Sequence, residues 1–139
     1  MKILLVGDIV GSPGRRVFRE VVKRLRAESA VHAVVVNAEN AAAGNGITLA
    51  LAEEIFTAGA DVITMGDHVW GQRELEATIG GEKRLVRPVN FPPGTPGQGY
   101  ATVQTALGPV TVVNLLGRVF MNPSDCPFRA MDALLNTLP

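Results

Sequence analysis

The chain has 139 residues and a mass of 14.7 kDa, enough for one compact domain with a hydrophobic core. Thirteen basic and thirteen acidic residues give a formal net charge of zero, so the composition carries no signature of nucleic-acid binding and no acidic tail. Apolar residues make up 47%, which excludes a disordered chain. The apolar run at residues 3–6 is too short for a membrane span, and the single cysteine excludes an intrachain disulfide. We therefore expect a cytoplasmic protein with no membrane partner.

Strands and helices alternate over the first eighty residues. Short runs rich in β-branched residues predict buried strands at residues 2–6, 31–37 and 62–65. Apolar residues at helical spacing predict helices that begin near residues 12, 49 and 70. We expect Ser12 to cap the first helix and Gly59 to end the second. This order predicts an α/β fold in which a parallel sheet carries flanking helices.

The second half of the chain has a different pattern. Residues 100–105 and 110–115 are two β-rich runs, and Gly108-Pro109 between them predicts the turn of a β-hairpin. Residues 128–138 predict an amphipathic helix that ends ahead of a proline. The apolar face of that helix needs a surface on which to pack.

Polar side chains follow each of the three predicted strands. Asp8 follows the first strand, the Asn-Ala-Glu-Asn run at residues 37–40 ends the second, and Asp67-His68 follows the third. Ligands of parallel α/β sheets bind at the carboxyl ends of the strands. Oxygen donors with one imidazole suit divalent Mn, Fe or Zn. Asp8 and Asp67 can converge on Glu39 if their strands are neighbours, which the β-α-β order favours.

Each of these residues also has a structural interpretation. Asp8 and Asp67 occupy positions where turn residues and helix caps are common, and Asn37 and Asn40 are frequent turn formers. Glu39 is harder to explain in this way, because a carboxylate beside a buried strand is costly unless it is paired or bound to a metal. Three acidic strand ends together favour a functional site.

The sequence singles out no substrate-binding residue. Residues 11–14 (Gly-Ser-Pro-Gly) lack the Lys-Ser/Thr ending of a P-loop and the G-x-G-x-x-G pattern, so we expect a tight turn there. Arg87, Asn90 and Arg118 lie in predicted loops, where each is open to phosphate binding or to a structural role. Cys126 has no histidine near it in sequence and is expected not to act as a nucleophile.

Five ordered blocks closely resemble the YmdB-like metallophosphoesterases, a bacterial branch of the calcineurin-like superfamily. The blocks are residues 7–15, 37–42, 66–70, 87–97 and 117–120. The likeness runs along the whole chain, and five blocks in order are more specific than any single motif. The resemblance implies the N-terminal part of a four-layer αββα fold, with residues 1–139 as a single domain.

The resemblance also implies a hydrolase with two divalent metal ions, Fe or Mn, that cleaves phosphodiesters, including 2′,3′-cyclic nucleotides. Carried over by residue, Asp8 and Asn40 would bind one metal, Glu39 would bridge both, and Asp67 would bind the other. His68 would be the general acid that protonates the leaving oxygen. A metal-bridging hydroxide would attack phosphorus as the nucleophile.

The sequence departs from the family pattern in two places. Asp67 replaces the asparagine of the family's Gly-Asn-His motif and adds a negative charge. No histidine follows His68, although family members supply three further histidine ligands from their second half. We therefore expect the chain to correspond to the amino-terminal portion of such an enzyme. We expect the 139 residues by themselves to bind metal weakly and to turn over slowly or not at all.

Two alternatives follow from the same features. The shortage of histidine is compatible with a non-catalytic α/β module that binds phosphate or a nucleotide. An α/β unit with an uncovered sheet edge exposes apolar surface, so we also expect a homodimer or a larger homo-oligomer.

Overall fold

A four-stranded parallel sheet forms the centre of the computed structural model, which describes residues 1–138. Its strands, in the order β1-β2-β3-β4, are Ile3–Val6, Ala33–Asn37, Val62–Thr64 and Leu85–Val86. Leu4 pairs with Val34 and Val36 pairs with Ile63, so consecutive strands are neighbours in the sheet. The predicted parallel sheet is confirmed. The two-residue strand β4, which is too short to give a sequence pattern, was not predicted.

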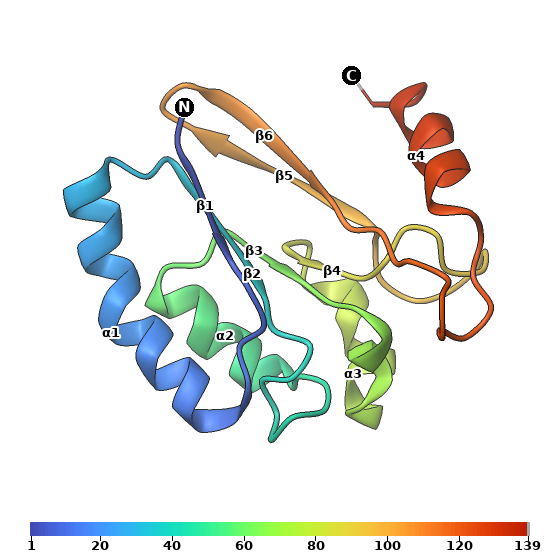
Figure 1. The fold of residues 1–139 in the computed structure, drawn as a ribbon, viewed down its shortest axis with the longest axis horizontal. Coiled ribbons are helices and arrows are strands. Elements are labelled where there is room, and N and C mark those ends of the chain that lie inside the picture. Colours follow the sequence, from blue (N-terminus) through green and yellow to red (C-terminus); the bar gives the residue numbers. More distant parts are fainter. Residues whose placement is uncertain (139) are drawn as a thin grey trace.

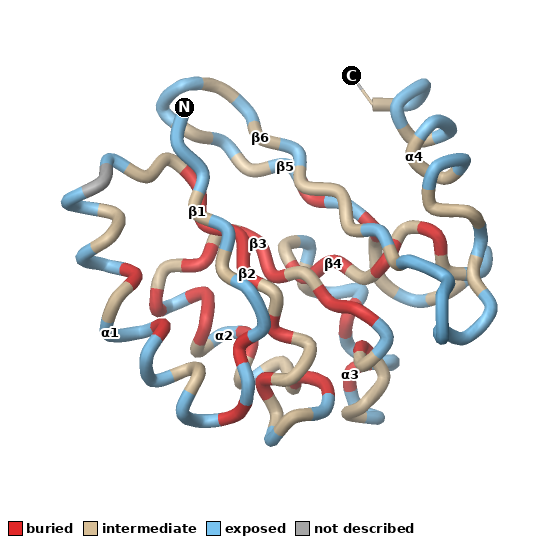
Figure 2. Tube along the Cα trace, in the orientation of Figure 1, coloured by how far each residue is buried: buried red, intermediate tan, exposed pale blue. Residues whose placement is uncertain are grey.

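Helices cover one face of this sheet (Figure 1). They are α1 (Gly11–Ser29), α2 (Leu49–Ala58) and α3 (Arg73–Thr78), with short 3₁₀ segments η1 (Asp67–Trp70) and η2 (Ile79–Gly81) on either side of α3. Phe18, Ile55 and Leu75 from the three helices belong to one buried apolar cluster with the sheet. Figure 2 shows that burial is concentrated in the central strands and in the helix faces turned toward them. No helix within residues 1–138 is long and apolar enough to cross a membrane.

An antiparallel hairpin covers part of the opposite face of the sheet (Figure 1). Its strands are β5 (Tyr100–Thr105) and β6 (Gly108–Val113). Ala101 packs with Val62 and Val86 in a second, smaller cluster on this face. The expected α/β fold with a parallel sheet, flanking helices and a hairpin is therefore confirmed.

The first helix begins earlier than the sequence pattern predicts. Its N-cap is Val10 and no side chain caps it, so the prediction that Ser12 is the cap is wrong. Gly11 has a φ of 55°, a left-handed value that glycine adopts without strain, and its N–H donates to the carbonyl of Asn40 at 2.9 Å. Pro13 falls in the first turn, where a missing N–H is tolerated. A tertiary contact with the loop after β2 therefore decides where the helix starts.

The predicted helix at residues 70–79 is divided into three short pieces. The chain passes so close to Asn45 at Gly71 that a Cβ atom there would lie 2.7 Å from Asn45 Cγ. Gly59, by contrast, ends α2 as predicted. The division therefore reflects close packing against the loop after β2, which the helical period does not encode.

The hairpin turn also differs from its prediction. Gly108 and Pro109 belong to β6, so the turn lies two residues earlier, between β5 and β6. Thr105 stabilises this turn, since its hydroxyl donates to the Gly108 carbonyl at 2.7 Å and accepts from Leu107 N–H at 3.1 Å. A side-chain hydrogen bond therefore fixes the loop length.

The last helix, α4 (Pro127–Leu135), has no buried residue. Figure 1 shows it apart from the sheet and from the other helices. Phe128 is 79% exposed, and Leu135 is exposed as well. The predicted helix is confirmed with an uncovered apolar side, and Pro139 lies outside the described residues.

Candidate active site at the carboxyl edge of the sheet

The predicted site residues lie where three neighbouring strands end. Asp8 follows β1, Glu39 and Asn40 follow β2, and Asp67 and His68 begin η1 after β3. Because β2 lies between β1 and β3, the strands that carry Asp8 and Asp67 are both neighbours of the strand that carries Glu39. Glu39, Asn40 and His68 are half-buried, while the two aspartates are exposed.

Hydrogen bonds join three of these residues across the edge. Asn40 Nδ2 donates to both carboxylate oxygens of Asp8 at 3.0 Å. Asn40 Oδ1 lies 2.6 Å from His68 Nδ1. With the amide nitrogen directed at Asp8, the amide oxygen accepts from the ring, so Nδ1 carries a proton. The other ring nitrogen, Nε2, lies 3.9 Å from Asp67 Oδ2.

Glu39 is held at the centre of the edge. Its Oε2 accepts from the His68 backbone N–H at 3.3 Å, and Asn37 Nδ2 donates to its Oε1 at 3.3 Å. A Cβ atom at Gly66 would lie 2.6 Å from Oε1 and closer still to Oε2. The carboxylate therefore needs a residue without a side chain at position 66. The hydrogen bonds offset the cost of its partial burial.

The loop that carries Glu39 and Asn40 is fixed from α1. Arg15 donates to the carbonyl of Ala41 and pairs with Glu54 of α2 at 3.2 Å. The helix spacing alone gives no signal of this role for Arg15. The N–H groups of Gly11 and Gly14 are bonded to backbone carbonyls, and residues 11–14 form the first turn of α1 rather than the separate tight turn that the sequence predicts.

Two of the three loop residues with open roles have structural partners. The Arg87 guanidinium donates to three backbone carbonyls of its own loop, and burial lowers its pKa. Asn90 is 1% exposed, and its Nδ2 donates to the carbonyls of Leu116 and Asp125 at 2.9 Å each. Arg118 is exposed. Arg87 and Asn90 therefore hold the loops that border the site.

Sequence reasoning missed a further positioning residue. Asn114 Nδ2 donates to the carbonyl of Met65 and, at 3.1 Å, to that of Val86. It thereby ties the end of the hairpin to the ends of β3 and β4. The spacing in this segment predicts only strand, so no local pattern could have identified it.

Within residues 1–138, no group of three or more His, Cys, Asp or Glu side chains is arranged to hold a metal ion. The donors at this edge are nevertheless of the kind that hard divalent cations take, namely three carboxylates and the Asn40 amide. The amide oxygen keeps a second lone pair when it accepts from His68. In chemical type, these residues fit a divalent cation.

The fold and this edge define an α/β protein with an acidic, histidine-containing site at the ends of parallel strands. The chain belongs to the family of YmdB-like proteins, which it matches over residues 4–139. The resemblance seen in the sequence is thus confirmed.

Known relatives share both sequence and fold with the chain. It is 44% identical over 135 residues to a 2′,3′-cyclic-nucleotide 2′-phosphodiesterase of Bacillus subtilis, covering 97% of this chain and 51% of the relative. A crystal structure of a hypothetical protein from Thermus thermophilus superposes with a TM-score of 0.91 at 35% identity. A crystal structure of a phosphatase from Mycoplasma pneumoniae gives 0.90 at 30% identity. These two alignments cover all of this chain and 54% and 52% of those chains. The chain spans about half the length of the relatives it matches.

Proposed function

We propose that the chain is a metal-dependent phosphoesterase that acts on phosphodiesters. The observation that carries the proposal is the meeting of Asp8, Glu39, Asn40, Asp67 and His68 at one edge of the sheet. The name of the Bacillus subtilis relative supports a 2′,3′-cyclic nucleotide as the substrate. Family membership supports the same class of reaction.

Two divalent metal ions, Fe or Mn, are part of the proposal. Asp8 and Asn40 would hold one ion, Asp67 would hold the other, and Glu39 would bridge them. When bound, such ions activate water and offset charge on the phosphoryl oxygens. Four protein donors are few for two ions, so we propose weak metal binding and slow turnover for this chain.

His68 is the general acid in this proposal. Its Nδ1 donates to Asn40, so only Nε2 can deliver a proton to the leaving oxygen. Donation from Nε2 while Nδ1 keeps its hydrogen requires the doubly protonated ring. Asn40, itself oriented by Asp8, fixes the direction in which that ring faces.

Hydrolysis of bis-p-nitrophenyl phosphate with added Mn²⁺ tests the proposal. We expect slow, metal-dependent hydrolysis that Glu39→Gln abolishes. Glu76→Gln, a matched change on the exposed side of α3, should leave the rate unchanged. Hydrolysis that survives Glu39→Gln would exclude this site. Full occupancy by two metals with fast turnover would contradict the proposed weak binding.

A second candidate function is a non-catalytic module that binds a nucleotide or phosphate. It is favoured by the lack, in the part of the chain that the structure describes, of three acidic or histidine side chains arranged around a cation. Calorimetry with a cyclic nucleotide in EDTA separates the two candidates. Binding without metal and without turnover would support the module, and binding only with metal would support the enzyme.

We further propose that a second copy of the chain pairs with β1. Within residues 1–138, this strand has a partner on one side only, because it is at the edge of the sheet. Its side chains are apolar on both faces, and Leu5 is 74% exposed. Strands with two apolar faces are typical of sheet interiors. Two copies related by a two-fold axis would satisfy both β1 edges with one interface.

An apolar groove of about 440 Å³ beside this strand supports the same interface. Leu4 and Val6 of β1 line it together with Val17 and Val21 of α1. A dimer through β1 would cover this groove as well as the strand edge. We expect sedimentation to show a dimer that Leu5→Lys dissociates, whereas Leu107→Lys in the hairpin turn should not. A wild-type monomer at high concentration would exclude the interface.

We also propose a cytoplasmic location. Cys126 is a free thiol, which a reducing compartment preserves. Fractionation of cells that express a tagged chain tests this. Recovery of the protein from an oxidising compartment would contradict it.

A further inference from the structure

A cavity of about 290 Å³ opens beside the candidate active site. Asp67 belongs to both, since it lines the cavity and its Oδ2 lies 3.9 Å from His68 Nε2. Trp70 of η1 and Phe91 of the proline-rich loop provide aromatic walls. The remaining lining residues come from residues 92–95 and 116–123. Three segments that are distant in sequence therefore enclose a space next to the proposed reaction centre.

The two aromatic side chains that line the cavity also pack against the protein core. Trp70 and Phe91 are half-buried and pack against the main apolar cluster. Their outer surfaces therefore remain in place without a ligand. An aromatic surface that is already ordered loses little conformational entropy when a flat ring stacks on it.

Buried and half-buried polar groups fix the loops that complete the cavity. Asn90 bonds both the N–H and the carbonyl of Leu116, which lines one wall. Arg87 donates to the carbonyl of Thr95 at 3.0 Å, and the Thr95 hydroxyl donates to the Pro92 carbonyl at 2.6 Å. Two of the three loop residues whose roles were open in the sequence, Arg87 and Asn90, thus support this cavity.

We propose that this cavity binds the base of a nucleotide whose phosphate lies at Asp67 and His68. The proposal rests on the phosphoesterase function above and adds its substrate selectivity. Trp70 and Phe91 offer stacking surfaces, and Asn122, an exposed residue of the lining, carries an amide with both a donor and an acceptor for a base edge. The volume lies near the lower end of small-molecule sites, as a single base requires.

Trp70 makes the proposal directly testable, because it is the only tryptophan of the chain. Adenosine is titrated in EDTA, and Trp70 fluorescence is followed against N-acetyltryptophanamide as the reference for inner-filter loss. We expect saturable quenching by adenosine and none by ribose 5-phosphate or inorganic phosphate. Adenosine carries no charge, so the acidic residues at the edge do not repel it in the absence of metal.

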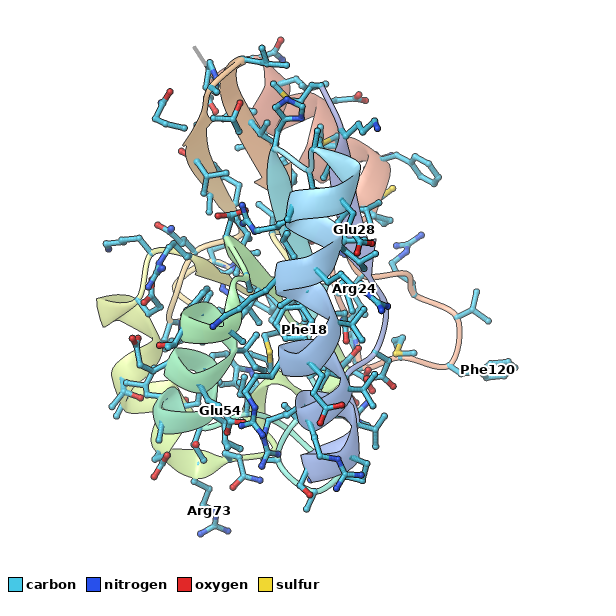
Figure 3. All side chains as sticks on the ribbon, turned by 90° about the vertical axis from the view of Figure 1, so that its left-hand side faces the viewer. Phe18, Arg24, Glu28, Glu54, Arg73 and Phe120 are labelled. Atoms are coloured by element: carbon cyan, nitrogen blue, oxygen red, sulfur yellow. The ribbon has the colours of Figure 1, made fainter. Side chains whose placement is uncertain are left out.

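Variants of Phe91 separate stacking from packing. Phe91→Leu keeps an apolar side chain against the core but removes the ring, and we expect about tenfold weaker binding of adenosine. Phe91→Tyr should restore binding to within about twofold, since it restores the ring. Phe120→Leu is the matched control, because Phe120 is fully exposed and projects from its loop (Figure 3). Circular dichroism and melting temperature confirm that each variant is folded.

The two proposals fail in different ways. If adenosine does not quench Trp70, or if Phe91→Leu and Phe120→Leu bind it equally well, the cavity is not a base site, whatever the rate with bis-p-nitrophenyl phosphate. If adenosine binds as expected but added Mn²⁺ gives no hydrolysis, the base site holds and the phosphoesterase proposal fails. Quenching by ribose 5-phosphate equal to that by adenosine would also overturn the base site.

Discussion

Helices α1 and α4 have similar amphipathic patterns but differ in how far their apolar sides are buried. The parallel sheet gives α1 a surface, and Phe18 and Val22 are buried there. No residue of α4 is buried, and Phe128 points into solvent. The apolar period determines that both segments are helical, but burial depends on an element that presents a complementary face. The region up to β4 is therefore held by its apolar core, whereas residues 115–138 are held by a few specific hydrogen bonds.

Asn90 is the most buried residue that forms such hydrogen bonds. It accepts from Leu116 N–H at 2.9 Å, and its own carbonyl accepts from Asp125 N–H at 2.9 Å. The apolar contacts in the core of the first region have no preferred direction, whereas the hydrogen bonds of Asn90 are directional. The two regions should therefore respond to substitution in different ways.

The largest expected difference is in stability. Ile55→Ala removes a fully buried side chain and should lower the free energy of unfolding by about 3 kcal/mol. Phe128→Ala, a larger truncation in α4, should change it by less than about 0.5 kcal/mol. Urea denaturation of both variants measures the contrast. A large loss for Phe128→Ala would mean that α4 is covered in solution, for example by a second copy.

Gly66→Ala should have the second-largest effect on stability. The added Cβ displaces the Glu39 carboxylate, and we expect a loss of about 1–3 kcal/mol together with loss of Mn²⁺ binding. Gly80→Ala is the matched control, since nothing lies within 4 Å of a Cβ at that position. Thermal melts and metal titrations measure both variants. Equal metal binding by the two variants would argue against Glu39 as a ligand.

Asn90→Ala tests the hydrogen bonds that Asn90 makes to residues 116 and 125. It removes the partner of the Leu116 N–H and of the Leu116 and Asp125 carbonyls, which should cost about 1–2 kcal/mol. We also expect faster hydrogen exchange in residues 115–125 and no change in β2. Asn122→Ala, at an exposed asparagine of the same segment, should change neither quantity. Uniform exchange across both regions in Asn90→Ala would show that they unfold together.

The smallest expected effect is a change in the reactivity of the Cys126 thiol at the start of α4. The backbone N–H groups of Arg129 and Phe128 at the start of α4, together with the positive charge of Arg118 and Arg129, lower the pKa of the thiol. A lowered pKa means more thiolate at a pH of about 7.5. Iodoacetamide should therefore react faster with the folded chain than with the chain in urea, and Arg118→Gln should slow the reaction. Equal rates in both states would show that α4 is not formed in solution.

Much of the fold could be predicted from the sequence. Periodicity of about 2 and 3.6 residues identified three strands, the helices and the hairpin, because each pattern reflects which side of an element is apolar. The element ends were less predictable. The start of α1 depends on a hydrogen bond to Asn40, and the division of the third helix depends on the approach of Gly71 to Asn45. Both partners are distant in sequence.

The site divides in the same way. Asp8, Glu39, Asn40, Asp67 and His68 could be named as candidates from the sequence, since polar residues follow three predicted strands in turn and parallel strands end at the same edge of a sheet. The open roles of Arg87 and Asn90 could not be decided there. Their partners lie in loops whose paths only the folded chain defines.

The sequence by itself determined a neutral α/β chain with an acidic, histidine-containing strand edge, because local patterns encode burial and strand ends. Only the tertiary structure decided that Asn40 links Asp8 to His68, and that Gly66 makes room for Glu39. It also decided that Trp70 and Phe91 form one cavity beside Asp67. These are contacts between side chains far apart in sequence, and the packing of the sheet, rather than any local preference, brings them together.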